Sequence, residues 1–190
     1  GFELWEDPHS GAPEDLQEFK WLLPANPNVM IELHGDLIHS PGLRRKLTFG
    51  RQEMLAVGEA SPEHPVALLM IAVVHAAGNH KFFRLQLLVD VLQAVRAMPA
   101  DAEAQFLRAA RRLGAEYELA VTLNAVGRVF DEEKALRLAA LLPGGLAVSV
   151  GKGLVTRRAV LDAPSTRPTW SRLQRDAYRL VQKTVGSRGA

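Results

Sequence analysis

Apolar and polar residues alternate along Val29–Leu37, which reads Val-Met-Ile-Glu-Leu-His-Gly-Asp-Leu. Successive side chains of an extended strand point to opposite faces, so Glu32, His34 and Asp36 are expected on one face and the apolar residues on the other. The apolar face is expected to join the core. The polar face either meets solvent, as in an ordinary half-buried strand, or carries metal-binding chemistry.

A turn-rich cluster, Pro24–Asn28, separates this strand from the apolar stretch Leu16–Leu23. Such a cluster between two apolar runs is typical of the connection in an antiparallel hairpin. The sequence therefore predicts a hairpin of Leu16–Leu23 with Val29–Ile38. The spacing of apolar residues over Asp15–Leu23 also fits a short helix, but we favour the hairpin.

Beyond Pro41 the apolar residues recur at the helical spacing of three or four. Ser61 as an N-cap and Pro62 at the first helical position mark the entry of the first long helix. The predicted helices are Leu43–Leu47, Pro62–Ala77, Phe82–Ala97, Asp101–Leu113, Glu116–Val129, Asp131–Leu141 and Thr169–Val185.

These elements predict an α+β chain in which a small N-terminal hairpin or sheet edge precedes a mainly α-helical bundle. We expect an α/β part over residues 1–40 and a helical bundle over 41–142. The breaks at Pro143–Gly145 and Ala163–Pro168 suggest that residues 143–190 form a linker and a last basic amphipathic helix packed on the bundle.

The chain has 190 residues, of which 47% are hydrophobic and 23% are charged. This composition predicts a folded core rather than disorder. No apolar run approaches the roughly 18 residues that a membrane span needs. Cysteine is absent, which excludes disulfides and thiolate metal sites and fits a reducing, cytoplasmic location.

The net charge is only +2, but the charges are unevenly distributed. Residues 1–36 contain eight acids and one Lys, whereas residues 151–190 contain nine Lys or Arg and two acids. The basic end either is solvated surface or binds an anionic partner such as RNA, lipid or phosphate. In the last helix one face is basic and the other is apolar, formed by Trp170, Leu173, Ala177, Leu180 and Val181.

Two polar residues interrupt the apolar faces of the predicted helices. His75 follows Leu68, Ile71 and Ala72 on one face and is either a hydrogen-bonded core residue or part of a site. Asp90 lies within Leu-Leu-Val-Asp-Val-Leu, where a buried carboxylate needs a partner.

The candidate partners of Asp90 are His75, Lys81 and Arg84, although Arg84 lies six residues away and does not share its helix face. His75 and His80 are five residues apart and are expected to diverge around a helix. With no Cys and no His-Glu-x-x-His motif, a zinc site is disfavoured.

The order of these motifs resembles a known family. An Ile-Glu-Leu-His strand is followed about forty residues later by Leu-Leu-Met-Ile-Ala-Val-Val-His-Ala-Ala, and then by Phe-Arg-Leu-Gln-Leu-Leu-Val-Asp-Val. Together they resemble the uncharacterised nucleotidyltransferase-like family of the DNA polymerase β-type superfamily. The resemblance covers roughly residues 1–130.

This resemblance implies a metal-dependent enzyme that transfers a nucleotide monophosphate from a nucleoside triphosphate to an acceptor not specified by the sequence. Glu32 matches the third acid of the superfamily site, with His34 beside it as a second catalytic residue. Glu32 and Asp36 would bind Mg²⁺ or Mn²⁺. His75, Arg84 and Asp90 match the helical motif, which we expect to support or line the nucleotide cleft.

The chain departs from the family pattern because it contains no Gly-Ser followed by an Asp-x-Asp pair. Gly1-Phe2 matches the point that follows this unit, so the catalytic half is expected upstream unless the chain is a non-catalytic relative. A helical binding or scaffolding module is the alternative function. A metal-dependent hydrolase using Glu32, His34 and Asp36, with further ligands from His9, His39 or His75, is a third.

Overall fold

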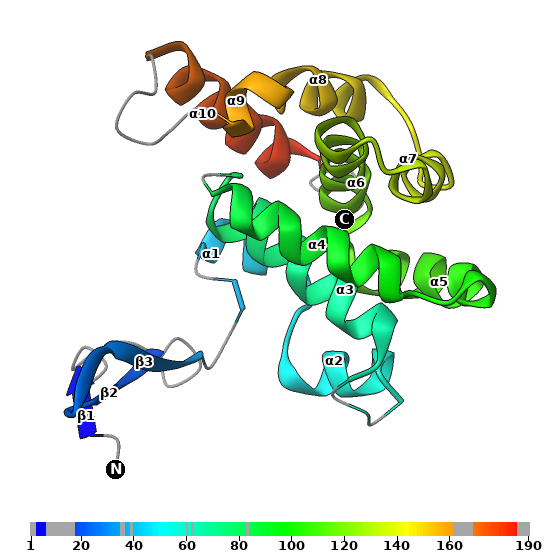
Figure 1. The fold of residues 1–190 in the computed structure, drawn as a ribbon. Helices are drawn as coiled ribbons and strands as arrows, with labels where there is room; N and C mark the ends of the chain where they lie inside the picture. The colour runs from blue at the N-terminus through cyan, green and yellow to red at the C-terminus, as the bar shows by residue number, and fades with distance from the viewer. Residues whose placement is uncertain are drawn as a thin grey trace.

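The computed structural model of the chain describes residues 3–6, 18–34, 37–38, 40–59, 61, 63–82, 84–161 and 169–185. A small antiparallel sheet precedes a mostly helical remainder, which confirms the predicted α+β order in outline (Figure 1). None of the helices in these ranges is both long and apolar enough to cross a membrane.

The sheet contains three antiparallel strands in the order β1-β2-β3. They are β1 (Glu3–Glu6), β2 (Glu18–Leu23) and β3 (Asn26–His34). The pairing of β2 with β3 confirms the predicted hairpin and rules out the short helix. The sequence analysis did not predict β1. Strand β3 ends at His34. Asp36, which was predicted on the same strand face, is outside the described residues.

The sheet is not covered by the helices. Val29, Met30 and Ile31 of β3 are all exposed, and because consecutive strand residues point to opposite faces, solvent reaches both faces here. Figure 1 shows the sheet set apart from the helical body, at the end of the segment that leads to α1. The prediction that Ile31 faces the core is therefore wrong. Burial begins after the strand, where Ile38 is fully enclosed.

Twelve helical segments follow in the described part of the chain. They are α1 (Pro41–Arg44), α2 (Arg51–Val57), α3 (Pro65–Val74), the π-helix η2 (His75–Asn79), α4 (Leu85–Ala97), the 3₁₀-helix η3 (Ala100–Ala102), α5 (Glu103–Leu113), α6 (Glu116–Phe130), α7 (Glu133–Ala140), α8 (Leu146–Leu154), α9 (Arg157–Leu161) and α10 (Thr169–Thr184).

Several boundaries differ from those predicted. Helix α3 starts at Pro65, and its N-cap is His64, whose Nδ1 accepts a hydrogen bond from the Val66 amide at 3.3 Å. Ser61 and Pro62 therefore do not open it. Helices α8 and α9 occupy part of the segment that was expected to be a linker. Both are short, and α8 contains two glycines, Gly151 and Gly153, which weaken its helical signal.

Helix α6 is the centre of the helical body. It is buried along almost its whole length and on all sides, as expected of a helix enclosed by others. Helices α3, α4, α7 and α8 all pack against it. Helix α5 ends at Gly114 (φ 66°), where the Lys46 carbonyl oxygen would lie 2.7 Å from an added Cβ. Only glycine fits this left-handed, tightly packed position.

Helix α10 packs on the body through a different face from the one predicted. Ser171, Tyr178 and Gln182 are buried, whereas Trp170 and Leu180 are each 67% exposed. Aromatic contacts and hydrogen bonds explain this orientation. The Tyr178 ring stacks on Tyr117 with centroids 5.8 Å apart, and the Gln182 amide reaches the carboxylate of Glu118 at 3.0 Å.

A buried ion pair links three parts of the chain. Glu118 of α6 is fully buried, and its Oε1 lies 3.0 Å from both Lys46 Nζ and Gln182 Nε2. Lys46 Nζ also donates to the Gln182 carbonyl at 3.2 Å and lies 5.2 Å from the centre of the Tyr117 ring. This Glu118 network joins the segment after α1 to α6 and α10.

Replacing Glu118 is therefore expected to be costly. Glu118→Ala leaves the Lys46 ammonium nearly buried without its anion, which costs about 3–5 kcal/mol of unfolding free energy. Urea denaturation of the purified chain measures this loss. Glu116→Ala is the control in the same helix, because the exposed pair of Glu116 with Arg111 at 3.7 Å contributes less than about 1 kcal/mol. Equal losses for the two variants would show that the network does not stabilise the fold.

Candidate functional site

An irregular turn, His75–Phe82, follows α3 and contains three of the polar residues considered from the sequence: His75, His80 and Lys81. We call it the π-turn. Its first part is the π-helix η2, and it closes with hydrogen bonds from His80 N to His75 O (3.4 Å) and from Phe82 N to Ala76 O (3.0 Å). Single π-turns of this kind occur frequently at functional sites. The sequence analysis predicted regular helix up to Ala77, so this feature was missed.

The π-turn brings two histidines together. The rings of His75 and His80 meet edge to face, with centroids 4.6 Å apart. The prediction that these side chains diverge assumed the α-helical spacing, in which residues five apart lie on different faces. A π-helix bonds residue i to residue i+5 and so places the second histidine next to the first.

The second half of the π-turn has a strained backbone. Lys81 and Phe82 have φ values of 47° and 60°, in the left-handed region that costs about 1–2 kcal/mol for each residue with a Cβ. Phe82 is buried and meets the Tyr178 ring edge to face, with centroids 5.1 Å apart. This packing offsets the strain, and it explains why α4 begins at Leu85 rather than at the predicted Phe82.

Hydrogen bonds attach two other segments to the π-turn. Asn79 Nδ2 donates to the Leu37 carbonyl at 2.5 Å, which binds the segment that follows β3. Arg179 of α10 donates to the Gly78 carbonyl. Three regions far apart in the sequence therefore meet here: the exit from the predicted polar strand, the π-turn and the last helix.

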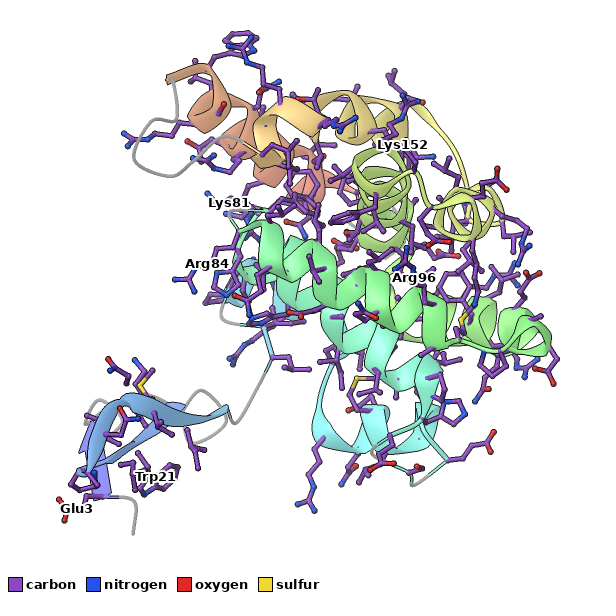
Figure 2. All side chains as sticks on the ribbon, viewed as in Figure 1. Glu3, Trp21, Lys81, Arg84, Arg96 and Lys152 are labelled. Atoms are coloured by element: carbon purple, nitrogen blue, oxygen red, sulfur yellow. The ribbon has the colours of Figure 1, made fainter. Side chains whose placement is uncertain are left out.

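The site is rich in cations. Lys81 Nζ lies 2.9 Å from Asp176 Oδ1, and this hydrogen-bonded pair lowers the pKa of the Asp176 carboxyl. Burial lowers the pKa of the Arg179 guanidinium, and the neighbouring Tyr178 and Glu118 oppose that shift. Figure 2 shows Lys81 and Arg84 at the same end of the helical body, and Arg84 is exposed as the N-cap residue of α4.

The tyrosines of the adjoining Glu118 network are strongly shielded. Burial is the main cause that raises the pKa of both Tyr117 and Tyr178, and the Glu118 carboxylate adds to it. Both hydroxyls are buried, and neither has a hydrogen-bond partner among the described residues. The two side chains therefore stay neutral and act here as packing groups.

The other predicted site residues divide into two groups. Glu32 and His34 lie in β3, paired with Lys20 and Glu18 of β2, but their side chains, like Asp36, fall outside what the structure describes. Asp90 is described, and it is exposed on α4. The prediction that it is a buried carboxylate in need of a partner is wrong, because the helix turns this position toward solvent.

Asn79 and Arg179 were not predicted from the sequence as contributors to this region. Lys81 was considered only as a candidate partner of Asp90, and His80 only for a disfavoured zinc site. Gly78-Asn79 directly after an apolar helix was the available signal, since this pair favours an irregular helix end. In the described parts of the chain, no three His, Asp or Glu side chains are grouped so that they could hold a metal ion.

Comparisons with protein-family models, curated proteins and solved structures gave no match for this chain.

The Lys81–Asp176 pair makes stability depend on pH. Because the folded state lowers the pKa of Asp176, the pair contributes stability above the ordinary value of 3.8 and loses it as the pH falls through the lowered value. We expect Asp176→Asn to reduce stability by about 0.2–1 kcal/mol at pH 7, the range for exposed pairs, and to have progressively less effect as the pH is lowered from 7 to 2.

Thermal unfolding of both proteins across this pH range measures the difference. Asp90→Asn is the control, since this exposed carboxylate has no cation partner among the described residues. A constant difference between wild type and Asp176→Asn at every pH would contradict the assignment.

Proposed function

We propose that the protein is nucleotidyltransferase-like and that the π-turn forms the helical side of its nucleotide site. The observation that supports this most directly is the hydrogen bond from Asn79 to the Leu37 carbonyl. Leu37 follows the segment that contains β3, with Glu32 and His34, and then Asp36, and Asn79 belongs to the turn that begins with His75. The segment that follows β3 is therefore held against the π-turn, about forty residues later in the chain.

The charges of the π-turn region fit a triphosphate. Arg84 is exposed, and its planar guanidinium can donate two parallel hydrogen bonds to phosphate oxygens. Lys81 is tied to Asp176, but that pair lies on the surface and can exchange partners at low cost. Asp90 points to solvent on α4 and is not assigned a role in binding.

The proposed reaction is transfer of a nucleotide monophosphate. An acceptor oxygen attacks the α-phosphorus and forms a new P–O bond, the bond to the bridging oxygen breaks, and pyrophosphate leaves with that electron pair. The acceptor proton passes to a base, for which His34 is our candidate. Mg²⁺ or Mn²⁺, when bound to Glu32 and Asp36, would stabilise negative charge on the reacting phosphates.

The sequence contains no Gly-Ser followed by Asp-x-Asp, so the two further acids that the family uses would have to come from another segment or protein. The proposal for this chain is therefore nucleotide binding, with transfer dependent on those acids. The acceptor is a molecule with a nucleophilic oxygen.

Calorimetric titration with ATP and Mn²⁺ tests the proposal. We expect saturable binding that Arg84→Ala weakens by roughly tenfold or more, because a charge-assisted hydrogen bond to phosphate contributes about 1.5–3 kcal/mol. Glu32→Ala should weaken the dependence on Mn²⁺. Arg108→Ala, an exposed arginine of α5, is the matched control and should bind like the wild type. Absence of ATP binding, or equal losses for the two arginine variants, would refute the proposal.

A specific observation supports a second function, that of a binding module for an anionic lipid surface. On α10, Trp170, Leu173 and Leu180 are 67%, 54% and 67% exposed, and helical spacing places them along one side. The cations Arg172 and Lys183 of the same helix are also exposed. Exposed Trp and Leu beside Lys and Arg are typical of helices that lie in the plane of a membrane interface.

Co-sedimentation with lipid vesicles tests this second function. Binding to vesicles that contain phosphatidylserine, but not to phosphatidylcholine alone, is expected, with a marked loss at high salt because charge attraction is screened. Trp170→Ala combined with Leu173→Ala should abolish binding, whereas Leu55→Ala, an exposed apolar residue of α2, should not. Equal binding to both vesicle types would contradict attraction between the cations of α10 and anionic lipid. Absence of binding to either vesicle type would reject the membrane-binding function.

A further inference from the structure

A cleft lies between α6, α7, α8 and the start of α9, away from the π-turn. Its volume is about 1110 Å³, and its lining residues all come from the range 124–157. No residue of the π-turn contributes to it. Cavities that bind small molecules commonly measure about 300–1,000 Å³, so this cleft is large enough for a metabolite.

A buried amide forms part of the cleft lining. Asn124 of α6 is only 8% exposed, and its Nδ2 has no hydrogen-bond partner among the described residues. Its Oδ1 accepts a hydrogen bond from Arg128 Nε at 3.4 Å. A buried donor without a partner is costly to the fold, and a ligand acceptor in the cleft would remove that cost.

Three cations from three helices also line the cleft: Arg128, Lys152 and Arg157. None of them forms an ion pair with a described residue. Figure 2 shows Lys152 on α8 beside α6. Two exposed carboxylates, Asp131 and Glu133, are the acidic residues of the lining, so positive charge is in excess.

The geometry points to a binding site for a small phosphorylated molecule with free hydroxyl groups. A phosphomonoester carries nearly two negative charges at neutral pH, which matches the excess positive charge of the cleft lining, and its oxygens can accept from the Asn124 amide. The carboxylates of Asp131 and Glu133 can accept hydrogen bonds from hydroxyl groups on the rest of the ligand. This site is independent of the proposed nucleotidyl transfer.

Calorimetric titration of the full chain with glucose 6-phosphate, inorganic phosphate and succinate tests the inference. We expect glucose 6-phosphate to bind more tightly than inorganic phosphate, and succinate to bind weakly. Lys152→Ala and Arg157→Ala should each weaken glucose 6-phosphate binding by roughly tenfold or more, since each removes a charge-assisted contact.

Two controls separate a built site from general attraction to a basic surface. Arg158→Ala removes the neighbouring exposed arginine of α9, which does not line the cleft, and should leave the affinity within about twofold. Arg84→Ala should also leave it unchanged, while it weakens ATP binding at the π-turn. Equal losses for Arg157→Ala and Arg158→Ala, or no binding of either phosphate, would overturn the inference.

The variant Asn124→Leu distinguishes a role of Asn124 in ligand binding from a role in the fold alone. The substitution removes a buried donor without a partner, so the melting temperature of the ligand-free protein should stay the same or rise. Glucose 6-phosphate binding should nevertheless weaken. A lower melting temperature with unchanged affinity would show that Asn124 serves the fold alone.

Discussion

The Glu118 carboxylate sets the strongest constraint on how this chain folds. A charge enclosed in the first turn of the central helix is tolerated only when its partners are in place, and here they are Lys46 and Gln182. The two partners are 136 residues apart in the chain. Meeting this one requirement therefore fixes the position of α10 and of the segment after α1 against α6. Helix α10 also holds the π-turn, because its Arg179 donates a hydrogen bond to the Gly78 carbonyl and its Tyr178 ring packs against Phe82.

The sequence predicted the regular elements well because apolar spacing decides them. The predicted hairpin forms, with its second strand at Asn26–His34 rather than Val29–Ile38, and the helix Glu116–Phe130 matches its predicted range to within one residue. The spacing of apolar residues did not predict the contact between His75 and His80. That contact depends on a π-helical turn, in which residue i bonds to residue i+5, and not on α-helical geometry. The spacing also predicted the wrong buried face for α10. There, the contacts of Gln182 with Glu118 and of Tyr178 with Tyr117 outweigh the burial of Trp170 and Leu180. Such pairings involve distant residues that the local pattern does not contain.

The candidate sites likewise combine residues that local motifs indicate with residues that only the fold brings together. The sequence names His75 and Arg84 as candidates because they belong to motifs, whereas Asn79 and Arg179 contact backbone carbonyls of other segments, which no local motif indicates. The cleft beside α8 was not predicted at all. Lys152 lies between two glycines in the sequence, and it gains its neighbours in the cleft only when α6 and α9 fold beside α8.

The free side of β3 has a consequence for handling the protein. The strand lies at one edge of the described sheet, and it carries three consecutive exposed apolar residues, Val29, Met30 and Ile31. An uncovered edge strand offers unpaired amides and carbonyls to any extended chain, which is a common start of aggregation. This edge, rather than the well-packed helices, should therefore limit the concentration at which the protein stays monodisperse.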